Sequence, residues 1–226
     1  MNLDKYFEID EDAFYIDMYG NHRFRGVLKY YGDTIRNDKA IQQAKLPSTP
    51  ISKVFSYINE FLELLREENG YTIRNIRYDT IMLDNSIHSI IDNGIVCHKL
   101  NWKSPVYNKN KRCYISWDSK YDEISKVFNN NIRDLIWLKF TNKGHVGVVA
   151  RGFDINFDSI NDNGKPISSD VLVKEVNESW DDSFVMLFPI TLQMLEKHTI
   201  EEIELGIGNY LISKDVPIID YYSHQN

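Results

Sequence analysis

Aromatic side chains in the second half of the chain have types and positions that could bind a planar ligand. They fall near the ends of expected strands or in the connections between strands: Trp102, Tyr107, Tyr114, Trp117, Trp137 and Trp180. Indole rings at the mouth of a small barrel can sandwich a nucleobase or enclose a methylated group, and stacking contributes about 1–3 kcal/mol per base. Aromatic residues are also common in strands and cores, so the same pattern is typical of core packing.

Motifs for catalysis and metal binding are mostly missing from the sequence. There is no G-x-S-x-G elbow, Walker loop, H-E-x-x-H helix or paired C-x-x-C. The six histidines are scattered without metal-ligand spacing, and neither Cys97 nor Cys113 lies two to four residues from another cysteine. Gly206 and Gly208 lack the third glycine of a dinucleotide site and indicate close helix packing instead. The sequence therefore predicts no cofactor and no structural metal.

Bulk composition limits the classes of partner. The 226 residues include 26 Lys and Arg against 33 Asp and Glu, a net charge of −7 that disfavours broad, non-specific binding to nucleic acid. A local basic groove remains compatible with this charge. No apolar run approaches the length of a membrane span, and the first residues lack a signal peptide's pattern. We therefore expect a cytoplasmic protein with free thiols and no membrane partner.

The first half of the chain shows short strands followed by helices. Acidic and aromatic residues predict a hairpin of residues 6–9 and 14–18 around a turn at 10–12, then a further turn at 19–21 and a strand at 23–31. A weak helical pattern covers residues 34–45. The strongest pattern follows Pro50, where apolar residues repeat at helical spacing until Gly70, a typical stop.

The second half of the chain is richer in strand patterns. It predicts strands at residues 112–117, 134–140, 145–151, 171–176 and 183–188, and helices at 120–128, 191–198 and 199–213. The last helix opens with a capping box formed by Thr199 and Glu202. The apolar segment 216–224 is expected to add a strand to the sheet or to a partner subunit.

A basic, proline-bearing run at residues 103–112 is typical of a connection between two lobes. We therefore predict an α+β protein with an N-terminal α+β lobe at residues 1–102 and a second lobe at residues 112–226.

Residues 112–195 resemble the EVE branch of PUA-like domains. The resemblance rests on the segment from Arg133 to Phe140, the turn and segment from Gly144 to Arg151, and a later strand and helix across residues 180–195. It implies a mixed small β-barrel for the C-terminal part, with C-terminal helices after it. Domains of this kind receive a flipped or modified nucleobase in a pocket lined by aromatic and polar groups.

The resemblance also implies roles for individual residues. Trp117 and Trp180 would flank the base, Tyr114 and Ser116 would offer polar contacts, and Trp137 would belong to the same aromatic set. The predicted phosphate contacts are Arg112, Lys139 and Arg151.

These patterns leave three hypotheses open. The first is a non-enzymatic module that binds DNA or RNA and reads a modified or flipped base, in a bacterial or phage defence or restriction system. The second is a metal-dependent nuclease or nucleotide hydrolase assembled from scattered acidic residues and histidines. The third is an acidic interaction or inhibitor protein that binds a protein partner. The sequence does not determine the ligand or the oligomeric state.

Overall fold

A five-stranded open sheet with α2 (Ile51–Glu68) and α5 (Ile200–Ser213) packed on one face organises the molecule. The computed structural model describes residues 2–25, 34–68, 88–90, 95–99, 132–153, 168–180, 184–191 and 194–224. The helices are α1 (Thr34–Ala44), α2 (Ile51–Glu68), α4 (Ser168–Glu175) and α5 (Ile200–Ser213), with short 3-10 turns η1 (Asp4–Tyr6), η2 (Glu11–Ala13) and η4 (Met194–Glu196). The strands are β1 (Phe14–Ile16), β2 (His22–Phe24), β3 (His88–Ile90), β4 (Ile95–Lys99), β5 (Ile132–Phe140), β6 (Val146–Phe153) and β7 (Phe184–Thr191).

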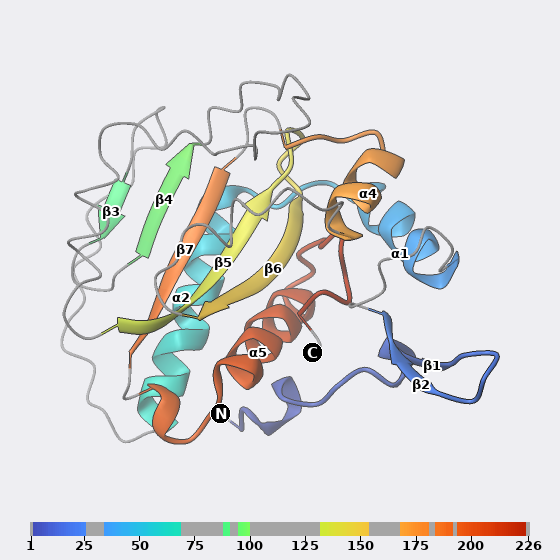
Figure 1. The fold of residues 1–226 in the computed structure, drawn as a ribbon. Coiled ribbons are helices and arrows are strands. Elements are labelled where there is room, and N and C mark those ends of the chain that lie inside the picture. The colour runs from blue at the N-terminus through green and yellow to red at the C-terminus, as the bar shows by residue number, and fades with distance from the viewer. Residues whose placement is uncertain are drawn as a thin grey trace, which may run out of the picture.

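The described strands make two separate sheets. Strands β3 to β7 form a five-stranded sheet in the order β3-β4-β7-β5-β6, in which every neighbouring pair is antiparallel. Strands β1 and β2 form a separate hairpin that extends outward from the body, beyond α1 and α5 (Figure 1). A tight turn at residues 141–145, in which Gly144 has a φ of 84°, joins β5 to β6 as predicted.

Helices α2 and α5 cover one face of the large sheet. Helix α2 buries one stripe of apolar side chains: Val54, Phe55, Ile58, Phe61, Leu62 and Leu65. The sequence prediction of this helix is confirmed, and so is the helix at residues 199–213. The Thr199 hydroxyl accepts a hydrogen bond from the Glu202 backbone N–H, and the Glu202 carboxylate accepts one from the Thr199 N–H, which completes the capping box.

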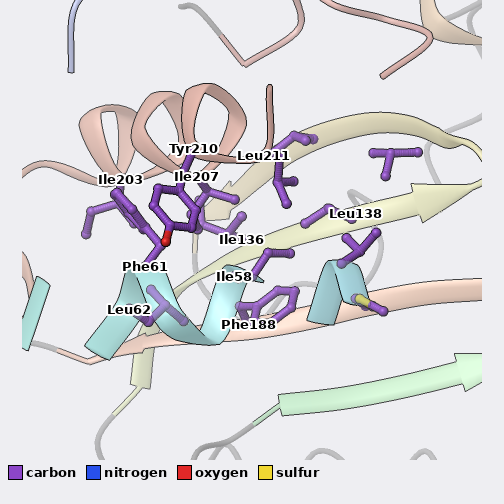
Figure 2. Close-up of a cluster of buried hydrophobic side chains, with 14 of the residues drawn as sticks. Ile58, Phe61, Leu62, Ile136, Leu138, Phe188, Ile203, Ile207, Tyr210 and Leu211 are labelled. Carbon is purple, nitrogen blue, oxygen red and sulfur yellow. The ribbon is translucent and has the colours of Figure 1, made fainter. Parts of the chain in front are cut away.

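The main core lies between these two helices and the sheet (Figure 2). Ile58 and Phe61 from α2 meet Ile207 and Tyr210 from α5, and Ile136 belongs to the sheet side of the same cluster. Because each fully buried side chain of this kind contributes about 1.5–3 kcal/mol, this layer dominates the stability of the fold.

The C-terminal segment after α5 belongs to the body of the molecule. Ile218 forms a parallel bridge with Val146, and the backbone N–H of Ile219 donates to the Val146 carbonyl at 2.8 Å. Ile218, Ile219 and Asp220 are all fully buried. The tail therefore extends the sheet of its own chain at the β6 edge.

Three local predictions are wrong. The helix predicted at residues 191–198 is not present in the described part of that segment, because β7 extends to Thr191 and Met194–Glu196 is only a 3-10 turn. The first hairpin pairs Phe14–Ile16 with His22–Phe24, because residues 11–13 form a 3-10 turn capped by the Asp10 side chain. Residues 171–176 do not form a strand, since Ser168–Glu175 is helix α4. Its valines suggest a strand, but Ser169, Leu172 and Val173 are buried at the i, i+3, i+4 spacing of one helical face.

The predicted α+β class is confirmed. A closed PUA-like barrel is not confirmed, because the described part of the second half contributes β5, β6 and β7 to an open sheet. The proposed lobe boundary at residues 102–112 lies outside the described residues. On either side of it, β4 and β7 are paired strands of one sheet.

Candidate interaction surface and the predicted pocket residues

The projecting hairpin is held by one carboxylate at its turn. Asp17 Oδ1 accepts hydrogen bonds from the backbone N–H groups of Tyr19 and Asn21, each at 2.9 Å. Asp17 Oδ2 accepts one from Arg23 Nε, also at 2.9 Å. These donors, led by the Asn21 backbone N–H and then Arg23, hold the pKa of Asp17 well below its usual range. The turn at residues 17–21 is therefore an ordered structure.

This ordered turn presents apolar side chains to solvent. Met18 is 87% exposed, Tyr19 82% and Ile16 66%. Side-chain exposure alternates along strand β1. Tyr15 lies under the guanidinium of Arg25, while Phe14 and Ile16 are exposed to solvent. Large apolar side chains gathered on an ordered element are typical of a surface that contacts another molecule.

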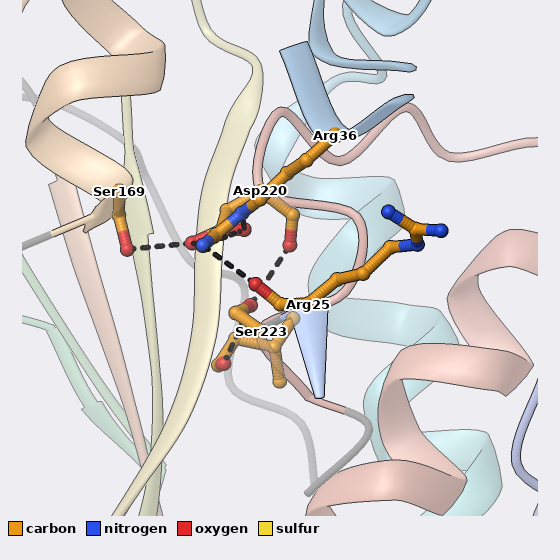
Figure 3. Close-up of polar contacts among 6 residues, drawn as sticks. Arg25, Arg36, Ser169, Asp220 and Ser223 are labelled. Atoms are coloured by element: carbon orange, nitrogen blue, oxygen red, sulfur yellow. Dashed lines mark hydrogen bonds and ion pairs between the residues drawn. The ribbon is translucent and has the colours of Figure 1, made fainter. Parts of the chain in front are cut away.

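A buried ion pair anchors the base of the hairpin (Figure 3). Arg36 from α1 donates to both carboxylate oxygens of Asp220, at 2.6 and 2.7 Å, and Ser169 donates to the same carboxylate at 2.8 Å. Arg36 Nη1 also donates to the carbonyl of Arg25, the residue that follows β2, at 2.8 Å. Arg25 in turn donates from Nε to the carbonyl of Asp12, just before β1. Both ends of the hairpin are thus tied to α1 and the C-terminal segment.

Acidic side chains lie on the segment that leads into the hairpin. Glu8, Glu11 and Asp12 are exposed, and Asp10 lies between them at the start of η2. Their charge reaches the C-terminal segment: burial, together with Asp10 and Asp12, raises the pKa of Tyr222 to about 12. The same three causes raise the pKa of Tyr221. The hairpin therefore combines a neutral apolar tip, formed by Ile16, Met18 and Tyr19, with an acidic base, formed by the carboxylates of residues 8–12.

A cleft of about 470 Å³ opens beside this base, between α1 and the segment after α5. Lys39 and Tyr221 line it, with the Lys39 ammonium 4.1 Å from the centre of the Tyr221 ring. Leu46 contributes an exposed apolar side chain. The cleft therefore shares Tyr221 with the region that is affected by the charges of Asp10 and Asp12.

Three of the predicted pocket residues lie together on the face of the sheet opposite α2 and α5. Trp137 and Lys139 alternate with the core residues of β5 and are 9% and 3% exposed. The Lys139 ammonium lies 4.5 Å from the centre of the Trp180 ring, and Trp180 Nε1 donates to Asp170 Oδ1 at 2.5 Å. Burial lowers the pKa of Lys139 to about 8, while the Asp170 charge opposes that shift. Among the residues that the structure describes, the Trp137 indole N–H has no hydrogen-bond partner.

Arg151 lies apart from this cluster, on the face of the sheet covered by α5. Its Nη1 donates to Glu204 Oε2 at 2.5 Å, and its Nε is 3.3 Å from Glu201 Oε1. Burial raises the pKa of Glu204 to about 7, with Arg151 acting in the opposite direction. Arg151 is therefore engaged by two carboxylates of its own chain.

Four further residues belong to the predicted site. Arg112, Tyr114, Ser116 and Trp117 lie outside the described residues.

Within the described ranges, no group of three or more His, Cys, Asp or Glu side chains is arranged to hold a metal ion. None of the helices in those ranges is both long and apolar enough to cross a bilayer.

Comparison of the chain with protein-family models, with curated proteins and with solved structures found no match. The resemblance to the EVE branch of PUA-like domains stays a prediction.

Sequence reasoning missed the residues at the tip of the hairpin. Ile16, Met18 and Tyr19 were assigned to a strand and a turn, and nothing in their types distinguished an exposed apolar residue from a buried one. The available signal was Asp17 followed by Gly20 and Asn21, since these residue types are typical of a tight turn that ends in an ordered loop.

Proposed function

We propose that this protein is a non-enzymatic interaction protein that binds a protein partner through the β1–β2 hairpin. The observation that carries the proposal is the high exposure of Ile16, Met18 and Tyr19 on a turn that Asp17 holds in place. A protein partner would bury these side chains, and an ordered turn loses little conformational freedom on binding. The proposal includes the cytoplasmic location expected from the sequence.

Site-specific crosslinking tests this function. A photoreactive amino acid replaces Ile16, and the full chain is irradiated in an extract of the cells that produce it. Any crosslinked protein is then purified and its affinity measured directly. The double variant Met18→Ser/Tyr19→Ser is expected to bind at least about tenfold more weakly, as for loss of interface hot spots.

Ile41→Ser is the matched control, because Ile41 is an exposed apolar residue on α1, outside the hairpin. It should leave the affinity unchanged. If the purified partner binds the double variant as tightly as the natural chain, the hairpin is not the binding surface and the proposal is wrong.

A second candidate function, base recognition in DNA or RNA, has its own support. Trp137 carries a buried indole N–H that has no hydrogen-bond partner in the described part of the chain, beside the cationic and aromatic pair of Lys139 and Trp180. That N–H would donate to an acceptor atom of a base, within the PUA-like arrangement that the resemblance implies. A defence or restriction role would belong to this candidate.

Oligonucleotide binding tests the second candidate. Single- and double-stranded DNA and RNA, with and without modified bases, are titrated against the natural chain and Trp137→Phe, which keeps an aromatic ring but removes the donor. Binding that prefers modified bases in the natural chain and is lost in Trp137→Phe would support base recognition. Absence of binding at low salt, where phosphate contacts are strongest, would rule it out.

A further inference from the structure

The inference concerns the chemistry of the hairpin's partner, and it rests on the proposed function. The tip is apolar and locally neutral, because the Asp17 carboxylate is paired with Arg23 and hydrogen-bonded to the turn. A partner must therefore offer an apolar groove to Met18 and Tyr19, since a polar surface would lose its water without compensation.

The base of the hairpin imposes a second condition. Residues 2–25 contain six carboxylates and three basic side chains, a net charge of −3. Two of the three basic groups are engaged near the hairpin: Arg23 pairs with Asp17, and Arg25 is buried against Asp12 and Tyr15. The third, Lys5, lies over the ring of Tyr6. Glu8, Glu11 and Asp12 remain exposed, so the base carries negative charge.

The carboxylates of residues 8–12 also affect side chains of the C-terminal segment. Asp10 and Asp12 contribute to the raised pKa values of Tyr221 and Tyr222, which lie on the C-terminal segment. Lys39, 4.1 Å from the Tyr221 ring, is a basic group on the α1 side of this region, and Arg36 of the same helix is paired with Asp220. A like-charged partner would be repelled here, whereas a basic rim would be attracted and guided to the tip.

We infer that the hairpin recognises a protein surface whose apolar groove is bordered by Lys and Arg side chains. The groove accepts Met18 and Tyr19, and the basic rim faces Glu11 and Asp12. Burial of the tip supplies affinity, and the charges supply selectivity and a salt-dependent association rate.

Two synthetic peptides test the inference on the full chain. Both are amphipathic helices with the same leucine face, and their polar face carries lysine in one and glutamate in the other. We expect the Leu/Lys peptide to bind at least about tenfold more tightly than the Leu/Glu peptide at low salt, and less so at high salt. Glu11→Gln/Asp12→Asn should remove most of this preference.

The control variant must change the net charge equally at another place. Glu67→Gln/Glu196→Gln does so at the end of α2 and in η4, away from the hairpin (Figure 1). The peptide preference should survive in this variant. Its loss there would mean that the overall charge of the protein, and not the base of the hairpin, attracts the lysine peptide.

The remaining outcomes separate the two proposals. Equal binding of the two peptides, weakened by Met18→Ser/Tyr19→Ser, would overturn the basic partner and leave the hairpin as a binding surface. Peptide binding that ignores Met18→Ser/Tyr19→Ser would overturn both. Tighter binding to phosphatidylcholine vesicles than to the lysine peptide would point to a membrane surface and overturn the protein groove.

Discussion

At the residue scale, Glu204 shows how burial creates a pH-dependent group inside a core. Its side chain lies between α5 and the sheet, with Arg151 as its charged partner and Glu201 close by. Burial disfavours the charged carboxylate, and the attraction of Arg151 offsets this only in part, so the pKa rises from 4.5 to about 7.

This shift predicts a loss of stability as pH rises from about 4.5 to about 7. In the unfolded chain Glu204 releases its proton near 4.5, while in the folded chain it holds the proton to about 7. Over that window the folded state binds more protons, so the free energy of unfolding falls, by up to about 1.4 kcal/mol per pH unit. Urea unfolding from pH 4 to pH 8 measures this slope.

Glu204→Gln should lack this component of the slope, because glutamine cannot ionise. Glu201→Gln is the control: it removes the other carboxylate beside Arg151 and leaves Glu204 in place, so the falling slope should persist. The slope should shift to slightly lower pH, because the Glu201 charge no longer raises the pKa of Glu204. Identical pH profiles for Glu204→Gln and the natural chain would show that folding does not raise the pKa of Glu204.

Residue types alone could not identify the candidate site. Lys139 and Arg151 were expected to meet phosphates, but their surroundings depend on which face of the sheet each occupies. Lys139 lies under Trp180, and Arg151 lies under α5. The exposure of Met18 follows from the absence of neighbouring described elements around the hairpin tip, which no local pattern encodes.

At the element scale, strong local signals predicted the structure well. Helix α2 follows from an unbroken apolar stripe, and α5 follows from its capping box. Helix α4 could not be predicted in this way. Its eight residues span only about two turns, and its valines favour a strand locally. Packing against the rest of the fold stabilises the helix instead.

Helix α5 also contains two glycines that let other elements approach closely. A Cβ atom added at Gly208 would lie 2.0 Å from the His224 ring, and one at Gly206 would lie 2.5 Å from the Phe61 ring. The sequence prediction of close packing at this pair is confirmed. His224 is fully buried, so its ring cannot turn into solvent to make room.

Gly208→Ala should therefore destabilise the protein, although alanine is the better helix former by about 1 kcal/mol. We expect a net loss of about 1–2 kcal/mol in urea unfolding, because an overpacking cost at the upper end of about 1–3 kcal/mol exceeds the gain in helix propensity. In the double variant Gly208→Ala/His224→Ala, the combined loss should be smaller than the sum of the two single losses. Stabilisation by Gly208→Ala would mean that the tail does not pack on this helix.

At the scale of the whole molecule, the C-terminal segment joins parts of the chain that are distant in sequence. Asp220 receives Arg36 from α1 and Ser169 from α4, while Ile218 bridges to Val146 at the edge of the sheet. Through Arg36, the same segment helps to hold the hairpin in place. The apolar sequence of the tail predicted its pairing with a sheet, but not the buried ion pair, because Arg36 and Asp220 are 184 positions apart.

Deletion of residues 216–226 should therefore prevent stable folding. The deleted part includes Ile218, Ile219 and Tyr222, each buried and each contributing about 1.5–3 kcal/mol, and it leaves Arg36 without its carboxylate. The summed loss approaches or exceeds the roughly 5–15 kcal/mol by which folded proteins are stable. Near-ultraviolet circular dichroism and calorimetry should show no cooperative transition for the truncated chain.

The hairpin variant Met18→Ser/Tyr19→Ser, measured in the same calorimetry, should keep its stability, in contrast to the truncated chain. Both side chains are more than four-fifths exposed, so their replacement removes little buried apolar surface and should leave Tm within a few degrees of the natural chain, as expected for about 0.5 kcal/mol. A normal melting transition for the truncated chain would show that the tail is dispensable. A large loss of Tm in the hairpin variant would show that its tip serves the fold, and the case for a binding surface there would be lost.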